Sequence, residues 1–246
     1  MTDRLLQRQV SLLTYLTSGA AIFDDGAGAA LPRPLRGIDP HLLHLEAQFS
    51  YDKRMAKITG AFPRTFAMLG DDLDELLREF VDTCPPVEIS RIVNARQFHD
   101  FLVTRWRRSP PAPPFLPDVA ACELACGSVV TAHDAQAAPA GPPDPGARAG
   151  SIRRHPGIVL LRCAYDVRPI FEGPGEDIEP ALRDTPLAVA VPVGEAGPRI
   201  AELPPVVFDL LASLDEWTDP SAFADTAEAE ELLIDLIDHG LVEVRA

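Results

Sequence analysis

The sequence predicts an α+β protein, with an N-terminal helical bundle followed by a C-terminal winged-helix-like α/β domain that contains a small antiparallel sheet. Three observations predict this fold class. Apolar residues recur at helical spacing over residues 1–134, periodicity is lost over 135–150, and short apolar runs of strand length appear in 151–246. The middle stretch is rich in proline, glycine and alanine, which is typical of a linker. We therefore expect a helical domain, a linker and a second domain with these boundaries.

The composition is that of a globular protein. Of 246 residues, 46% are hydrophobic and 24% are charged, and the formal net charge is −15. No apolar run approaches the roughly 18 residues of a membrane span. Polar residues interrupt the apolar N-terminus, which favours an amphipathic helix over a signal peptide: Gln7, Arg8, Gln9, Ser11 and Thr14. We expect a cytoplasmic protein that does not bind membranes.

Helical periodicity is clearest in DDLDELLREFVDTCPP. Asp71 and Asp72 suit the positive end of the helix dipole, and Pro85 and Pro86 stop the helix. The apolar residues form one stripe: Leu73, Leu76, Leu77, Phe80 and Val81. A second helix carries an inward set of Phe98, Phe101, Leu102 and Trp106. A third carries Val119, Cys122, Cys126 and Val129. We expect five or six helices in this domain.

The second domain is expected to contain both strands and helices. The run GIVLLRCAYDV predicts a strand, and LAVAVPVGEAGPRIAEL predicts two strands around a turn at 194–197. The segment PPVVFDLLASLDEW predicts a helix with an inward face of Val207, Leu210, Leu211 and Leu214. A further helix begins at Thr226 and ends at Gly240, and LVEVRA closes the chain as a strand. This order is typical of a winged helix.

The charge of the second domain argues against a nucleic-acid partner. Residues 186–246 hold only two basic residues, Arg199 and Arg245, against 13 acidic ones, for a net charge of −11. Such a surface repels a phosphate backbone. Winged helices also capture peptides as an added strand. We expect a peptide beside Leu187–Val193 or Arg199–Leu203, over the helix that follows Thr226. The candidate peptide-binding residues are Leu187, Val189, Val191, Arg199, Ala201, Glu231 and Asp235.

The first domain contains two basic clusters. Lys53 and Lys57, the only lysines of the chain, flank Arg54, and TRWRRSPP supplies the second cluster of Arg105, Arg107 and Arg108. Each cluster is either a solvated face or a surface that meets acidic groups. Those groups would belong to a partner protein or to the chain's own C-terminal domain.

No catalytic or metal-binding set is evident in the sequence. It contains no G-x-G-x-x-G, P-loop, G-x-S-x-G or H-E-x-x-H. His41, His44 and Glu46 could share neighbouring helix turns, but a single helix would supply all of them, which favours a surface helix. The four cysteines form no C-x-x-C pair, which favours buried thiols. We expect a binding or scaffold protein that holds no metal or cofactor.

Three segments resemble a known family: AFPRTFAMLGDDLDELLREFVDTCPP, FHDFL and PFLPDVAACELA. Their order of helices and turns, over roughly residues 45–130, is similar to that of the partner-protein family of the multinuclear non-heme iron-dependent oxidative enzymes. The segment FSYDKRMAKI departs from the Tyr-Arg-Asn type of run in the commonest members. It looks more like the members that serve methanobactin biosynthesis, the making of a copper chelator.

The resemblance implies a function and its partners. Such proteins form a heterodimer with an iron-dependent TIM-barrel oxidative enzyme and help deliver a ribosomally synthesised precursor peptide (a RiPP) through its leader. The enzyme holds the iron and modifies cysteines, in methanobactin to oxazolone and thioamide groups. The chain itself would be an accessory subunit with no catalytic residue. The alternatives are a partner for a different modified peptide, or a transcription regulator.

Overall fold

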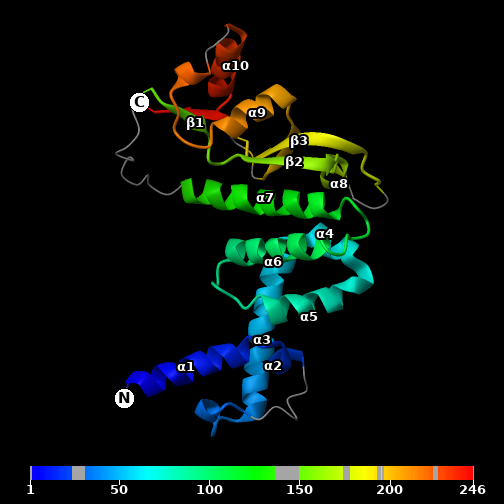
Figure 1. Ribbon diagram of the computed structural model, residues 1–246, viewed down its shortest axis with the longest axis vertical. Helices are drawn as coiled ribbons and strands as arrows, with labels where there is room; N and C mark the ends of the chain where they lie inside the picture. The colour runs from blue at the N-terminus through cyan, green and yellow to red at the C-terminus, as the bar shows by residue number, and fades with distance from the viewer. Residues whose placement is uncertain are drawn as a thin grey trace. The chain divides into compact units, whose positions relative to one another are not determined.

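The structure is a computed structural model that describes residues 2–23, 31–136, 150–173, 178–192, 195, 197–223 and 227–245. It is a mixed α+β protein (Figure 1). The chain forms two compact units, Met1–Ala120 and Ala121–Ala246, and the division falls within helix α7. Most of the predicted linker, 137–149, lies outside the described residues. None of the helices in the described ranges is long and apolar enough to cross a membrane.

Unit 1 is helical, as the periodicity predicts. Its helices are α1 (Thr2–Leu16), α2 (Gly19–Phe23), α3 (Pro40–Thr59), α4 (Pro63–Leu69), α5 (Leu73–Thr83), α6 (Arg91–Trp106) and the first residues of α7 (Leu116–Gln136). The carboxylate of Asp39 caps α3 by accepting a hydrogen bond from the His41 N–H at 2.9 Å. Gly70, which follows α4, has a φ of 56°, a left-handed conformation that favours glycine.

The core of unit 1 is a cluster of phenylalanines around α6. The Phe98 ring lies 5.0–6.3 Å, centre to centre, from four other rings, those of Phe62, Phe66, Phe80 and Phe101. Phe62, Phe80 and Phe98 are fully buried. The predicted inward face of α6 is therefore confirmed, and so is that of α5 at Leu76, Phe80 and Val81, whereas Leu73 and Leu77 are only partly buried.

The described residues of unit 2 form two antiparallel sheets where the sequence predicted one. Strands β2 (Val159–Tyr165), β3 (Leu182–Ala190) and β4 (Arg199–Glu202) form the first, and β1 (Ile152–Arg154) pairs with β5 (Val242–Val244) in the second. The helices are α8 (Arg168–Glu172), α9 (Pro205–Ser213) and α10 (Ala227–Asp238). Neither β1 nor α8 was predicted, because each is too short for a periodic signal.

The three-stranded sheet has apolar packing on both faces. Ala125 and Val129 of α7 pack against Val189 and Ile200 on one face. On the other, Leu160 of β2 packs against a second core that joins α9, α10, β1 and β5. The buried members of that core are Ile152, Leu211, Leu214, Leu233, Leu236 and Val242.

The predicted end of α10 is confirmed. Gly240 has a φ of 70°, and the Leu241 N–H donates to the Leu236 carbonyl oxygen at 2.8 Å. The predicted start at Thr226 lies outside the described residues. Of the four cysteines, Cys122 and Cys163 are buried and Cys84 and Cys126 are partly buried, and none of the four is in a disulfide.

Candidate functional site

The order of strands in the three-stranded sheet determines which strand edges a peptide could pair with. β3 lies between β2 and β4, so its backbone is paired on both sides: Val189 lies opposite Val159 of β2 and Ile200 of β4. Leu187 is paired in the same way, with Leu161 and Glu202. Of the expected position Leu187–Val193, the part Leu187–Val189 is therefore closed to an added strand, because both edges of β3 are occupied there, and Val193 lies outside the described residues. The sequence shows that a strand is apolar but not which strand is central.

β4, the second predicted position, is an outer strand of this sheet. The Leu203 N–H donates to the Pro186 carbonyl oxygen at 2.9 Å, so this opposing pair is hydrogen-bonded. Hydrogen-bonded and non-hydrogen-bonded pairs alternate along an antiparallel ladder. Ala201 and Arg199 therefore bond to β3. The N–H and C=O groups of the alternate residues, Ile200 and Glu202, point away from β3 toward the outer edge.

The side chains of β4 leave this edge open to solvent. Arg199 and Ala201 are exposed, and Arg199 pairs with Glu195 at 2.6 Å. Ile200 points to the other face, where it packs with Val191 in the cluster on α7. The predicted residues of this site therefore divide into exposed edge groups and buried anchors that hold the sheet on its helix.

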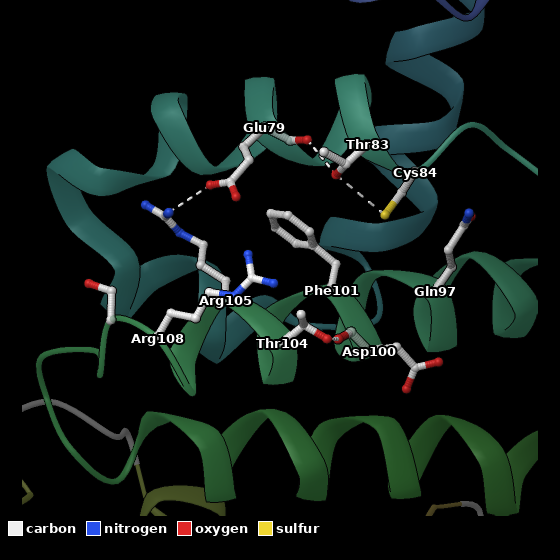
Figure 2. Close-up of a pocket in the computed structure, with 10 residues that line it drawn as sticks. Glu79, Thr83, Cys84, Gln97, Asp100, Phe101, Thr104, Arg105 and Arg108 are labelled. Carbon is white, nitrogen blue, oxygen red and sulfur yellow. Dashed lines mark hydrogen bonds and ion pairs between the residues drawn. The ribbon is translucent and has the colours of Figure 1, made fainter.

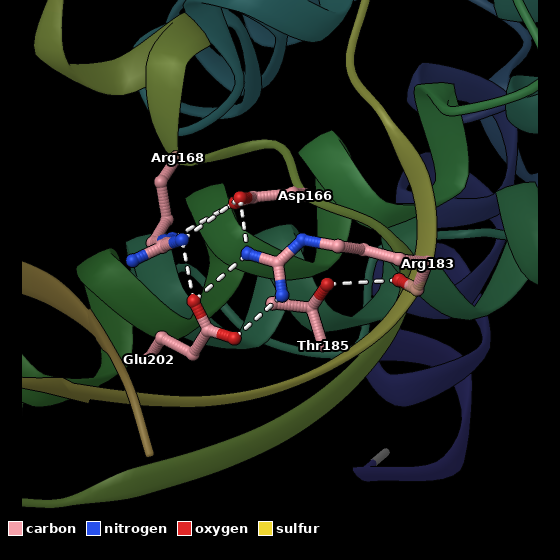
Figure 3. A network of polar contacts seen from close by, with 5 residues as sticks. All are labelled: Asp166, Arg168, Arg183, Thr185 and Glu202. Carbon is pink, nitrogen blue, oxygen red and sulfur yellow. Dashed lines mark hydrogen bonds and ion pairs between the residues drawn. The ribbon is translucent and has the colours of Figure 1, made fainter. Parts of the chain in front are cut away.

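An ion-pair network at the end of β4 holds the strand in place (Figure 3). Glu202 accepts from Arg183 of β3 at 2.5 and 2.8 Å and from Arg168 of α8 at 2.6 Å. Asp166 accepts from the same two arginines, at 2.6 Å from Arg183 and 2.8 Å from Arg168. Two cations and two carboxylates thus form a neutral cluster that connects β3, β4 and α8. We refer to these four residues as the β4 clamp.

The β4 clamp was not predicted from the sequence. Its members lie up to 36 positions apart, and only the antiparallel register brings them together. The available signal was the occurrence of Asp166 and Arg168 directly after an apolar run, and of Arg183 just before the next.

The clamp changes the ionisation of its own carboxyls. Hydrogen bonds from Arg168, with a further contribution from Arg183, hold the pKa of Asp166 well below its usual range despite the opposing effect of burial. Hydrogen bonds from Arg183 likewise lower the pKa of Glu202. The same contacts raise the pKa of Arg183. Both carboxyls are therefore ionised throughout the neutral range.

Lowering the pH should reduce the free energy of unfolding of unit 2, because the carboxyls of the β4 clamp become protonated. Because the folded-state pKa of Asp166 lies below its unfolded value, its contribution to stability is complete above about pH 4 and is lost as the pH falls through the folded value. We expect Asp166→Asn to lower the free energy of unfolding at pH 7. The difference in this free energy between the variant and the wild type should become smaller below pH 4. Urea unfolding at pH 7, 5, 4 and 3 measures this.

Asp184→Asn is the matched control for that experiment. Asp184 also pairs with an arginine, Arg162 at 2.6 Å, but the two side chains are 59% and 55% exposed. Exposed pairs contribute little, so this variant should differ from the wild type by less than Asp166→Asn at pH 7. If the difference in free energy of unfolding between Asp166→Asn and the wild type is the same at pH 7 and pH 3, the role given to the clamp is contradicted.

The acidic residues predicted on α10 lie in a different part of unit 2. Glu231 and Asp235 are exposed, as expected. However, the buried side of α10, Leu233 and Leu236, packs with β1, β5 and α9, and it is α9 that contacts β3. The carboxylates of α10 thus contribute to the negative charge of unit 2 and form no part of the β4 edge.

The first basic cluster separates into one internal and two outer side chains. Arg54 donates to Asn94 at 3.1 Å and to Gln97 and the Cys84 carbonyl oxygen at 2.8 Å, and its guanidinium lies 4.5 Å from the centre of the Phe80 ring. Burial lowers its pKa. Nε and Nη2 of Arg54 thus bind this chain, which makes Arg54 less available to a partner than an exposed cation, and its partner contact stays a prediction. Lys53 is exposed, and Lys57 is half-buried.

The second basic cluster separates in the same way. Figure 2 shows Arg105 of α6 directed toward Glu79 of α5, at 2.6 Å, across a pocket of about 450 Å³. Glu75 lies 3.9 Å from the same guanidinium. Arg105 therefore joins two helices of unit 1 and is not free for a partner. Arg107 and Arg108 are exposed, and Arg108 lines the pocket.

Among the described residues, no group of three or more histidine, cysteine, aspartate or glutamate side chains is arranged to hold a metal ion. His44 of the predicted histidine pair instead lies 2.8 Å from the Ala21 carbonyl oxygen. No protein-family model matches this sequence, and no curated protein matches it significantly.

Proposed function

We propose that this chain is a non-catalytic partner subunit that binds an iron-dependent oxidative enzyme and recruits a ribosomally synthesised precursor peptide for cysteine modification. The observation that carries the proposal is the outer edge of β4, where the backbone groups of Ile200 and Glu202 face outward. The resemblance of residues 45–130 to partner proteins of such enzymes supplies the enzyme class, with methanobactin-type chemistry as its most specific form.

An edge of this kind suits the capture of an extended peptide. An added strand forms main-chain hydrogen bonds with the outward groups, and these contribute affinity without depending on the peptide's sequence. The β4 clamp fixes the end of the strand through several short contacts. A strand that is already ordered loses less conformational entropy on binding, which favours affinity.

Charge supplies the selectivity in this proposal. Residues 186–246 carry a net charge of −11, so a leader with lysine or arginine residues is attracted to unit 2. Such attraction acts mainly on the association rate and on the choice of partner. The same charge disfavours a transcription regulator, since a winged helix that reads DNA needs cations toward the phosphates. In the alternative in which this chain serves a different modified peptide, the leader binds to the same edge of β4 and only the sequence of the leader differs.

Co-expression with an iron-dependent oxidative enzyme encoded beside this chain tests the proposal. We expect the two proteins to co-purify in a fixed ratio, with iron in the complex. The precursor peptide should change mass only when both proteins are present. A variant with Glu231→Lys and Asp235→Lys keeps β4 intact and should mainly slow leader association. Failure to co-purify, or equal peptide modification by the enzyme alone, would exclude the partner function.

A further inference from the structure

Helix α1 presents an apolar face to solvent. Every residue from Arg4 to Val10 is exposed, and the helix extends from the rest of unit 1 in Figure 1. Four large apolar side chains are more than half exposed: Leu5 at 60%, Leu6 at 58%, Val10 at 54% and Leu13 at 64%. At 100° per residue they fall within one face of the helix. An exposed apolar face of this size with polar residues around it is typical of an interaction site, so this face is suited to a partner.

A pocket of about 300 Å³ continues this face. Leu13 belongs to both, since it is exposed on α1 and also lines the pocket with Leu16 and Ile22. Ile89 also lines the pocket and is itself 86% exposed. From Leu5 to Leu13 the helix rises about 12 Å at 1.5 Å per residue, so the apolar surface extends well past the pocket.

The chain's only two lysines line this pocket. Lys57 Nζ donates to the Ile89 carbonyl oxygen at 2.6 Å and so holds the wall of the pocket against α3. Lys53 is exposed, and among the described residues its ammonium has no hydrogen bond or ion pair. One carboxylate, that of Glu88, also lines the pocket. The pocket therefore combines aliphatic walls with an excess of positive charge.

We propose that the apolar face of α1 and this pocket form the docking surface for the partner enzyme, and that the docked segment carries aliphatic side chains flanked by carboxylates. This rests on the proposed function for the identity of the partner. The aliphatic side chains would cover Leu5, Leu6, Val10 and Leu13, and a carboxylate would pair with Lys53.

The chain's own acidic helix fits this surface less well. On α10 the exposed carboxylates surround a single exposed large apolar residue, Ile234 at 54%. One such side chain cannot cover the four on α1, so α10, from this chain or from a second copy, is a weaker match than a segment with several aliphatic side chains. A small amphiphile could fill the pocket, but it would leave the first two turns of α1 uncovered.

The test uses the full chain and the same enzyme, with dissociation constants measured by biolayer interferometry. Leu6→Glu combined with Val10→Glu should weaken the complex at least tenfold, because both side chains are solvent-exposed in the free chain and buried in the complex. Lys53→Glu should weaken it several-fold, with a smaller salt dependence than the wild type. Leu182→Glu, at a leucine of unit 2 that is 74% exposed, is the matched control and should bind as the wild type does.

Hydrogen exchange gives an independent measurement. Amides of residues 4–13 should exchange rapidly in the free chain and become protected in the complex, whereas β4 should respond only to the leader. If the variants bind the enzyme as the wild type does, the docking surface is wrong and the partner function stands. If no complex forms, both proposals fail. Self-association of the wild type that Leu6→Glu with Val10→Glu abolishes would assign the surface to a second copy.

Discussion

Replacing Ile200 by proline should weaken leader binding roughly 5- to 150-fold while the sheet stays paired. The Ile200 N–H points away from β3, so proline removes a donor from the outer edge and none from the β3–β4 ladder. A leader carbonyl that meets the proline loses one hydrogen bond and is left unsatisfied, which costs about 1–3 kcal/mol. That range corresponds to roughly 5- to 150-fold in the dissociation constant. Fluorescence anisotropy with a labelled leader peptide measures the effect.

Ile200→Ala is the matched control, because the Ile200 side chain packs in the cluster on α7 and both substitutions remove it. Alanine keeps the N–H group, so only the proline variant tests the edge. Near-ultraviolet circular dichroism and thermal unfolding should show similar changes in the two variants. If a folded Ile200→Pro variant binds the leader as tightly as Ile200→Ala, the peptide does not add to β4.

The period and the length of the apolar patterns in the sequence predicted most of the secondary structure. The apolar stripes of α5 and α6 repeat over three or more turns, and all their predicted inward residues are buried except Leu73 and Leu77, which are partly buried. β2, β3 and β4 were predicted because each is an apolar run next to a turn. β1 and α8 have three and five residues, too few to show a period. The pairing of the strands into two sheets depends on contacts distant in sequence, which no local pattern specifies.

The candidate sites were predicted less completely, for a physical reason. A cluster of arginines in a sequence does not reveal how many of their donors bind the chain itself. Arg54 and Arg105 each bind acceptors 26 to 43 positions away, and this leaves Lys53, Arg107 and Arg108 as the exposed cations of the two clusters. The exposed face of α1 was treated only as amphipathic, since the sequence does not show whether an apolar face is covered. The burial of an arginine side chain thus decides whether its charge stabilises the chain's own fold or is available to a partner.

Truncating Phe98 to alanine should have the largest effect on stability of any single substitution in unit 1. Phe98 is fully buried, and its ring contacts those of Phe62, Phe66, Phe80 and Phe101. Removing such a side chain costs about 3–5 kcal/mol, from lost transfer free energy and the cavity left behind. Each aromatic pair adds roughly 0.5–1.5 kcal/mol beyond the buried area. Since a domain is stable by only about 5–15 kcal/mol, this loss removes a large part of the free energy of unfolding of unit 1.

The two tryptophans report separately on the two units. Trp106 is buried in unit 1 at the end of α6, and Trp217 stacks with Arg153 in unit 2. In a Trp217→Phe background, urea unfolding followed by fluorescence therefore measures unit 1 alone. Phe66→Ala is the control: Phe66 is half-buried and its ring pairs with that of Phe98, so the loss should be roughly 1–2 kcal/mol. Because α1 and its pocket belong to unit 1, Phe98→Ala should also weaken enzyme binding in proportion to the fraction of unit 1 that unfolds, and leave leader binding to unit 2 in place. Equal losses of stability for the two variants would show that Phe98 is not the centre of this core.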